Sequence, residues 1–176
     1  MITATSDKSM LEGVPKELSE LSKLYAHLLV TIDGLWFLEV EKSRGLDEAV
    51  KLDENVWRNF GRYEGKRIKE LLGIETVSNI EDFSKILLLT PMMVRMEPKV
   101  EIHDNRLFMS VTDCKPQQAR VRKGLGEFPC KSVSLAWFEG IAPELGSQIR
   151  FKCHFCPPDQ HPSDLWCKWE VWIEQN

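Results

Sequence analysis

The sequence predicts an α+β fold, in which N-terminal helices pack on a C-terminal antiparallel sheet with a cysteine-rich hairpin. Apolar residues recur every three or four positions in the first half and every second position in the second half, which indicates helices followed by strands. The 176 residues suit one domain of ordinary size. We therefore expect an N-terminal tail over residues 1–14 and a single domain over residues 15–176, with a helical part at 15–95 and a β-rich part at 98–176.

The first predicted helix begins at Lys16. Its apolar residues stand three or four positions apart, at Leu18, Leu21, Tyr25, Leu28 and Ile32. This spacing is typical of an amphipathic helix. Apolar residues continue past Gly34, so either a second helix or a kinked extension is expected to end near Gly45.

The next helix is expected to begin with Asp47 as its N-cap and to end at Gly73. It contains Gly61 and Gly65, which either weaken the helix or let another backbone approach it closely. A shorter helix near residues 80–89 completes the helical part.

The second half is predicted to form strands and two further helices. The stretch "KVEIHDNRLFMSV" alternates apolar and polar residues, so strands at 99–104 and 106–113 should pair across a tight Asp-Asn turn. The stretch "KPQQARVRKGLG" predicts a short basic helix, and another helix is expected to begin at Cys130. The last two strands are expected at 148–153 and 165–173, as a second antiparallel pair.

Composition excludes several classes of function. Apolar residues make up 43% and charged residues 28% of the chain, which is typical of a soluble globular protein. The net charge of -4 gives no reason to expect nucleic-acid binding. The apolar stretches are too short to span a bilayer, and the first residues do not resemble a secretory signal. We therefore expect a cytoplasmic protein without a membrane segment.

The cysteines are the main candidates for chemistry. All five lie in the last third of the chain, and their odd number argues against a disulfide framework. Cys153, Cys156, His161 and Cys167 have a spacing that could hold zinc. The alternative is that Cys153 and Cys167 face inward across a hairpin as ordinary buried thiols. The spacing leaves both interpretations open.

Two further cysteines are expected near that hairpin, because Cys114 ends a strand and Cys130 begins a helix. The segment between them is basic and includes Arg120. A positive field lowers the pKa of thiols and attracts anions. The alternative interpretation is an ordinary solvated basic helix, above all for Arg122 and Lys123. Elsewhere the signals are weak: His27 is expected to be a core residue, and no pair of carboxylates is evident.

The stretches "DCKPQQARVRKGLGEFPCKSV", "CHFCPPDQHPSDLWCKWEV" and "GLWFLEVEKSRGLDEAVKLDENVWRNFGR" resemble an uncharacterised family of cytosolic bacterial and archaeal proteins. It is a domain of unknown function related to the L-2-amino-thiazoline-4-carboxylic acid hydrolase-like proteins. More distantly, the chain is similar to the 4-vinyl reductase-type small-molecule-binding domain, which shares its fold with a Golgi transport component. The resemblance implies a ligand pocket between helices and sheet. Its pattern positions are Cys114, Arg120, Cys130, Cys153, Cys156 and Cys167.

Three functions therefore stand as expectations. The first is binding of a small molecule near the cysteines, with Cys114, Arg120, Cys130, Cys153 and Cys167 as ligand-binding residues. The second is a hydrolase of thiazoline-like or amide-like substrates, with the thiolate of Cys114 or Cys130 as nucleophile. The third is a zinc-stabilised structural protein or homodimer. No cofactor other than zinc is expected.

Overall fold

The computed structural model describes residues 16–174, and its first half is helical, as predicted. The four helices are α1 (Lys16–Arg44), α2 (Leu46–Leu71), α3 (Ile80–Leu89) and α4 (Pro91–Met96). The proposed tail at 1–14 lies outside the described residues. None of the helices within 16–174 is long and apolar enough to cross a membrane.

The second half contains the sheet and two more helices, which confirms the α+β class. In chain order these elements are β1 (Lys99–His103), β2 (Arg106–Val111), α5 (Lys115–Arg122), α6 (Cys130–Leu145), β3 (Ile149–Phe155) and β4 (Cys167–Ile173). All four strands are antiparallel, in the order β1-β2-β4-β3. Both predicted strand pairs are present, each within two residues of its expected bounds.

Several helix ends differ from the prediction. The first helix runs through Gly34 without a break, because one glycine weakens a helix by only about 1 kcal/mol. Asp47 is not the N-cap of α2: Gly45, with φ of 87°, takes that position, and Asp47 lies in the first helical turn. Gly73 follows the helix with φ of 66°, which confirms it as the stop. The short α4, which starts with Pro91, was not predicted.

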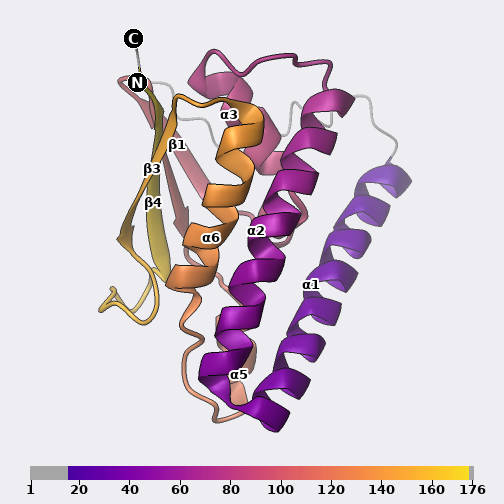
Figure 1. Ribbon diagram of the computed structural model, residues 1–176, viewed down its shortest axis with the longest axis vertical. Coiled ribbons are helices and arrows are strands. Elements are labelled where there is room, and N and C mark those ends of the chain that lie inside the picture. Colours follow the sequence, from indigo (N-terminus) through magenta and orange to yellow (C-terminus); the bar gives the residue numbers. More distant parts are fainter. Residues whose placement is uncertain (1–15, 175–176) are drawn as a thin grey trace.

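Close packing of α2 on α6 determines the architecture. A Cβ atom on Gly61 would lie 2.6 Å from the carbonyl oxygen of Trp137, and one on Gly140 would lie 2.0 Å from that of Arg58. Both distances are too short for any side chain, so these glycines let the two backbones touch. Of the two readings of Gly61, close approach is the correct one. Figure 1 shows α6 between the sheet and α2, with α1 on the outer side of α2.

The core lies between the sheet and α6. Met109 pairs with Trp169 and Leu107 pairs with Val171, so these four side chains lie on the inner face of the sheet. Phe138 of α6 contacts this face, with its ring 5.1 Å from that of Trp169.

Helix α1 is different, because the apolar residues that predicted it point outward. Leu18, Leu21, Tyr25, Leu28 and Ile32 are between 40% and 62% exposed. Its only fully buried residue among those described is Ala26. The periodicity therefore predicted the helix correctly, while the face it marks is not part of the core.

Candidate functional site

An apolar cavity of about 140 Å³ lies beneath α4, between the sheet, α2 and α6; we call it the inner chamber. Five elements, α2, α4, β2, α6 and β4, contribute its large side chains. These include Trp57, Met93, Met96, Met109, Trp137 and Trp169. Sulfur and aromatic rings therefore make up much of the wall, and both are polarisable surfaces that suit an apolar ligand.

Four of the five cysteines line this inner chamber: Cys114, Cys130, Cys156 and Cys167. The sulfurs of Cys130 and Cys156 are 3.4 Å apart, and Cys156 also hydrogen-bonds to Cys167. The thiols thus come together from the start of α5, the start of α6 and the β3–β4 hairpin. Cys114 and Cys130 therefore lie beside two of the hairpin cysteines, Cys156 and Cys167, as the positions of the strand and helix ends predicted.

Polar contacts hold this thiol cluster in place. Gln117, which is fully buried, donates a hydrogen bond to the carbonyl of Phe128 (2.7 Å) and accepts one from its N–H (2.8 Å). The same amide lies 3.3 Å from the sulfur of Cys130. On the other side Lys131 forms an ion pair with Asp159 (2.8 Å), which ties the start of α6 to the hairpin loop. Cys130 is therefore fixed from both directions.

The thiols differ in their acidity. Burial raises the pKa of Cys114 to about 12, so this thiol stays protonated at neutral pH. Hydrogen bonds to Cys130 and Cys167 raise the pKa of Cys156. The hydrogen bond from Cys156 lowers the pKa of Cys167, with help from Trp169 and the backbone of Val111. Within the cluster, Cys167 is the thiol whose surroundings favour the thiolate.

The proposed zinc ligands are only partly brought together. Cys156 and Cys167 are neighbours, but Cys153 does not line the inner chamber, and burial raises its pKa to about 11. His161 contacts the carbonyl of Pro162 (2.9 Å) and lies 3.4 Å from Glu127. Across residues 16–174 no three His, Cys, Asp or Glu side chains are grouped so that they could hold a metal ion. Zinc stays an untested prediction.

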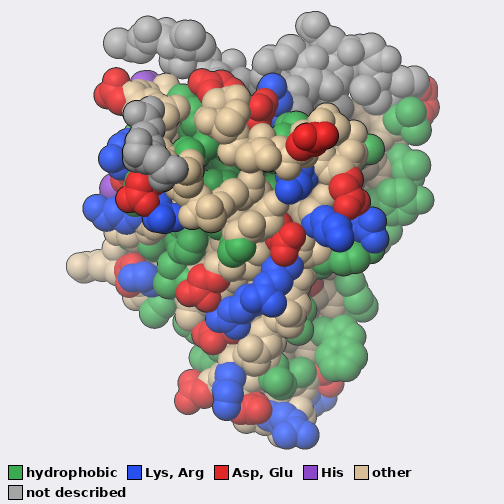
Figure 2. Space-filling model, turned by 45° about the horizontal axis from the view of Figure 1, so that its top comes forward, with side chains coloured by type: hydrophobic (Ala, Val, Ile, Leu, Met, Phe, Trp, Pro, Cys, Tyr) green, Lys and Arg blue, Asp and Glu red, His purple; other side chains and the backbone are tan. Residues whose placement is uncertain are grey.

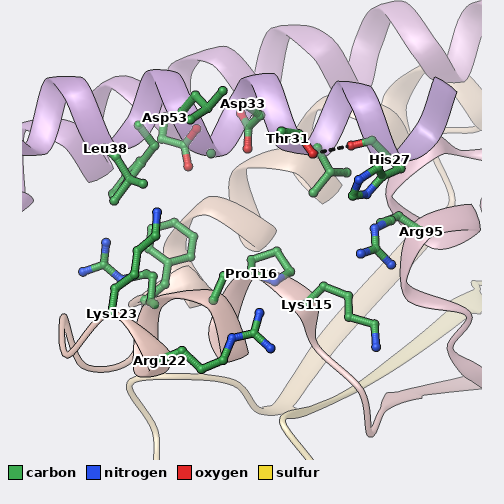
Figure 3. A pocket seen from close by; sticks show the side chains of 17 residues that line it. His27, Thr31, Asp33, Leu38, Asp53, Arg95, Lys115, Pro116, Arg122 and Lys123 are labelled. Carbon is green, nitrogen blue, oxygen red and sulfur yellow. Dashed lines mark hydrogen bonds between the residues drawn. The ribbon is translucent and has the colours of Figure 1, made fainter. Parts of the chain in front are cut away.

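A second cavity of about 330 Å³ adjoins the inner chamber; we call it the outer cavity. It lies between α1 on one side and α5 on the other, and Figure 3 shows its two walls. Lys115, Arg122 and Lys123 bring positive charge to the α5 side, and Arg95 adds a further positive charge from α4. His27 lines the α1 side and is exposed, so the expectation that it is a core residue is wrong.

Two carboxyl groups stand where the cavities meet, because Asp33 of α1 and Asp53 of α2 line both. Burial raises the pKa of Asp33 to about 6. Burial and the charge of Asp33 raise the pKa of Asp53 to about 8, although the neighbouring indole N–H of Trp57 acts to lower the pKa of both carboxyls. At neutral pH the pair therefore carries about one negative charge and one proton.

Arg120, a predicted ligand-binding residue, is engaged within the protein. Its guanidinium forms a two-pronged ion pair with Glu41 of α1, with one N–O distance of 2.5 Å and another of 3.0 Å. It also donates to the carbonyl of Leu125 (3.3 Å). Its side chain is 8% exposed, so this buried pair joins α5 to α1, and Arg120 lines the outer cavity. Its charge is already neutralised by Glu41.

Sequence reasoning missed the carboxyl pair, since no paired carboxylates were evident. A signal was nevertheless present in α2, where Ala49, Asp53, Trp57 and Gly61 follow each other at four-residue steps on the buried face. An acidic residue on a stripe of otherwise apolar and small residues indicates a buried carboxyl. Asp33 beside Gly34 interrupts an apolar run of α1 in the same way.

Fold and cavities together define an α+β domain with a polarisable apolar chamber that opens toward a cationic rim. The chain belongs to a family of unknown function, DUF6125, whose model matches residues 14–173. Comparison with curated proteins finds no match. The family match confirms the expectation of a domain of unknown function, whereas nothing in it links the chain to the thiazoline hydrolases or to the 4-vinyl reductase-type domains.

Proposed function

We propose that this protein binds a small amphipathic anion, with a group the size of one ring in the inner chamber and the anionic group in the outer cavity. The observation that carries this proposal is the wall of residues that the two cavities share. Asp33, Asp53, Pro116 and Phe128 line both, so one molecule can occupy the apolar and the cationic part at once.

The volume of the inner chamber supports a single ring. At about 140 Å³ it is close to the roughly 150 Å³ of an engineered apolar cavity that binds benzene. The aromatic walls formed by Trp57, Trp137 and Trp169 suit a planar group, and the methionines can adjust around it. A long alkyl chain would exceed this space.

The charges of the outer cavity support an anionic group. Arg95, Arg122 and Lys123 form no ion pair with another described residue, so their charges are available to a ligand. The charge on Asp33 and Asp53 at the junction would repel an anion that moved deeper. The ligand is therefore oriented with its ring inward and its charge toward the rim.

Isothermal titration calorimetry with 3-phenylpropionate tests this proposal. Binding is expected to weaken about fivefold for 3-phenylpropan-1-ol, which has the ring but no charge, because the attraction between the carboxylate and the cations of the outer cavity, about 1 kcal/mol, is lost. The double variant Arg122→Gln/Lys123→Gln is expected to lose the same factor for the anion and little for the alcohol. The matched control is Lys66→Gln/Lys152→Gln, which removes two exposed charges that line neither cavity.

Two results would contradict the proposal. If the anion and the alcohol bind with equal affinity, and Arg122→Gln/Lys123→Gln leaves both affinities unchanged, the cations of the outer cavity take no part in binding. If neither ring compound binds at millimolar concentration while circular dichroism shows an intact fold, the inner chamber is not a site for such ligands.

A second candidate is a cysteine hydrolase, and the lowered pKa of Cys167 inside the inner chamber favours it. The nucleophile would then be Cys167 rather than Cys114, whose raised pKa keeps it protonated. Iodoacetamide at pH 7 should modify Cys167 faster than Cys114, as read by peptide mass spectrometry. If both react at the slow rate of a buried thiol, this candidate function is lost.

A further inference from the structure

The outer face of α1 is an apolar surface without a cover among the described residues. Eight of its large side chains are between 40% and 68% exposed: Leu18, Leu21, Leu24, Tyr25, Leu28, Ile32, Leu35 and Trp36. Figure 2 shows hydrophobic side chains following the right-hand edge of the molecule, where Figure 1 places α1. Exposed apolar surface of this extent marks an interaction site on a soluble domain.

The spacing of these residues identifies the kind of interaction. Leu18, Leu21, Tyr25, Leu28, Ile32 and Leu35 follow steps of three, four, three, four and three residues. This is the a/d pattern of a coiled coil, and it forms a narrow stripe on the helix surface, which we call the α1 seam. The stripe extends over about 26 Å at 1.5 Å per residue. It is shaped to pack against one other helix.

We infer that the α1 seam is a homodimer interface, in which α1 packs antiparallel against α1 of a second copy. The seam is symmetric about a point between Tyr25 and Leu28. In an antiparallel pair Leu18 therefore faces Leu35 of the second copy, Leu21 faces its Ile32 and Tyr25 faces its Leu28, and the two-fold axis repeats each contact. A parallel pair would instead place the two Tyr25 rings against each other.

The area of the surface is sufficient for a stable dimer. Large apolar side chains present roughly 150–250 Å² each when fully exposed. The six seam residues and the adjacent Leu24 and Trp36 are each about half exposed, so together they offer roughly 700 Å² per copy. Specific interfaces bury roughly 800 Å² per partner. Ala26 is the only described residue of α1 that is fully buried, so the helix also lacks the burial that ordinarily stabilises one of its length.

Light scattering coupled to size-exclusion chromatography of the full chain tests the dimer. The wild type is expected at twice the chain mass of 20.4 kDa. Leu21→Glu/Leu28→Glu should elute as a monomer with an unchanged circular dichroism spectrum, because both side chains are exposed. The matched control is Leu71→Glu, which alters a residue that is 80% exposed at the end of α2, outside the seam; it should stay dimeric.

Disulfide cross-linking with diamide tests the orientation. The double variant Leu21→Cys/Ile32→Cys should form a cross-linked dimer on a non-reducing gel. Leu21→Cys alone should give no more cross-linked dimer than the wild type does. Cross-linking of the single variant would overturn the antiparallel arrangement. A wild type that is monomeric at 100 µM would overturn the dimer, and so would a monomer that binds lipid vesicles through this face.

Discussion

Replacing Asp53 with asparagine should change how the stability of the protein depends on pH. The pKa of this carboxyl is raised from 3.8 to about 8 by burial, so the folded state keeps a proton that the unfolded chain releases near pH 4. Unfolding free energy therefore falls as pH rises from 5 to 8. Asparagine carries no charge at any pH and should remove the share of this slope that Asp53 contributes. Asp33 and Glu64, whose pKa values burial raises to about 6 and about 7, should keep contributing the rest.

The size of the effect follows from the shift. Each pKa unit corresponds to about 1.4 kcal/mol, so a carboxyl that titrates near pH 8 instead of 3.8 can remove up to roughly 4 kcal/mol between pH 5 and pH 8. Relaxation around the ionised group and entry of water lower this figure, and we expect roughly 2–4 kcal/mol. The stability of Asp53→Asn relative to the wild type should therefore rise by this amount between pH 5 and pH 8.

Urea unfolding followed by tryptophan fluorescence at the two pH values measures the effect. Carboxyls whose pKa is lowered, such as Asp82 and Asp159, are ionised in both states above pH 5 and contribute little in this window. Asp47→Asn is the control, since Asp47 is exposed in the first turn of the same helix. A wild type that gains stability toward pH 8, or an Asp53→Asn variant with the wild-type slope, would refute the reasoning.

Three other outcomes are expected. In urea unfolding, Gly140→Ala should destabilise the protein by about 3 kcal/mol, since its Cβ would lie 2.0 Å from the Arg58 carbonyl oxygen. Gly34→Ala, whose Cβ would have no atom within 4 Å, should stabilise it by up to about 1 kcal/mol. Equal effects of the two substitutions would contradict the close packing of α2 on α6. Arg120→Ala should cost about 3 kcal/mol because it leaves the partly buried Glu41 unpaired, and an unchanged midpoint would show that the pair is not structural. EDTA should leave the midpoint unchanged, while a marked drop with release of zinc would favour the zinc interpretation.

The fold could be predicted from the sequence to the extent that local patterns determine it. The change from helical to strand period, the Asp-Asn turn and the start of α6 at Cys130 were all readable, because each depends on a few neighbouring residues. The ends of α2 were less certain, since capping depends on backbone geometry at Gly45. Which face of α1 is buried depends on the tertiary arrangement, and the apolar pattern marked the exposed one.

The candidate site was partly predictable. Convergence of Cys114 and Cys130 with the hairpin followed from strand and helix ends meeting at one edge of the sheet. The ion pair of Arg120 could not be predicted from the sequence, because its partner Glu41 lies 79 residues away in the chain. The pairing of Asp33 with Asp53 likewise requires knowing how α1 lies on α2. Long-range contacts of this kind leave no signal in residue spacing.

The most direct test of the proposed function is a crystal structure of the protein with 3-phenylpropionate. The account predicts density for the ring in the inner chamber, against Trp137 and Trp169, and density for the carboxylate in the outer cavity toward Arg122 and Lys123. Ring density elsewhere on the molecule, or an inner chamber filled by a metal ion held by the thiols, would contradict it.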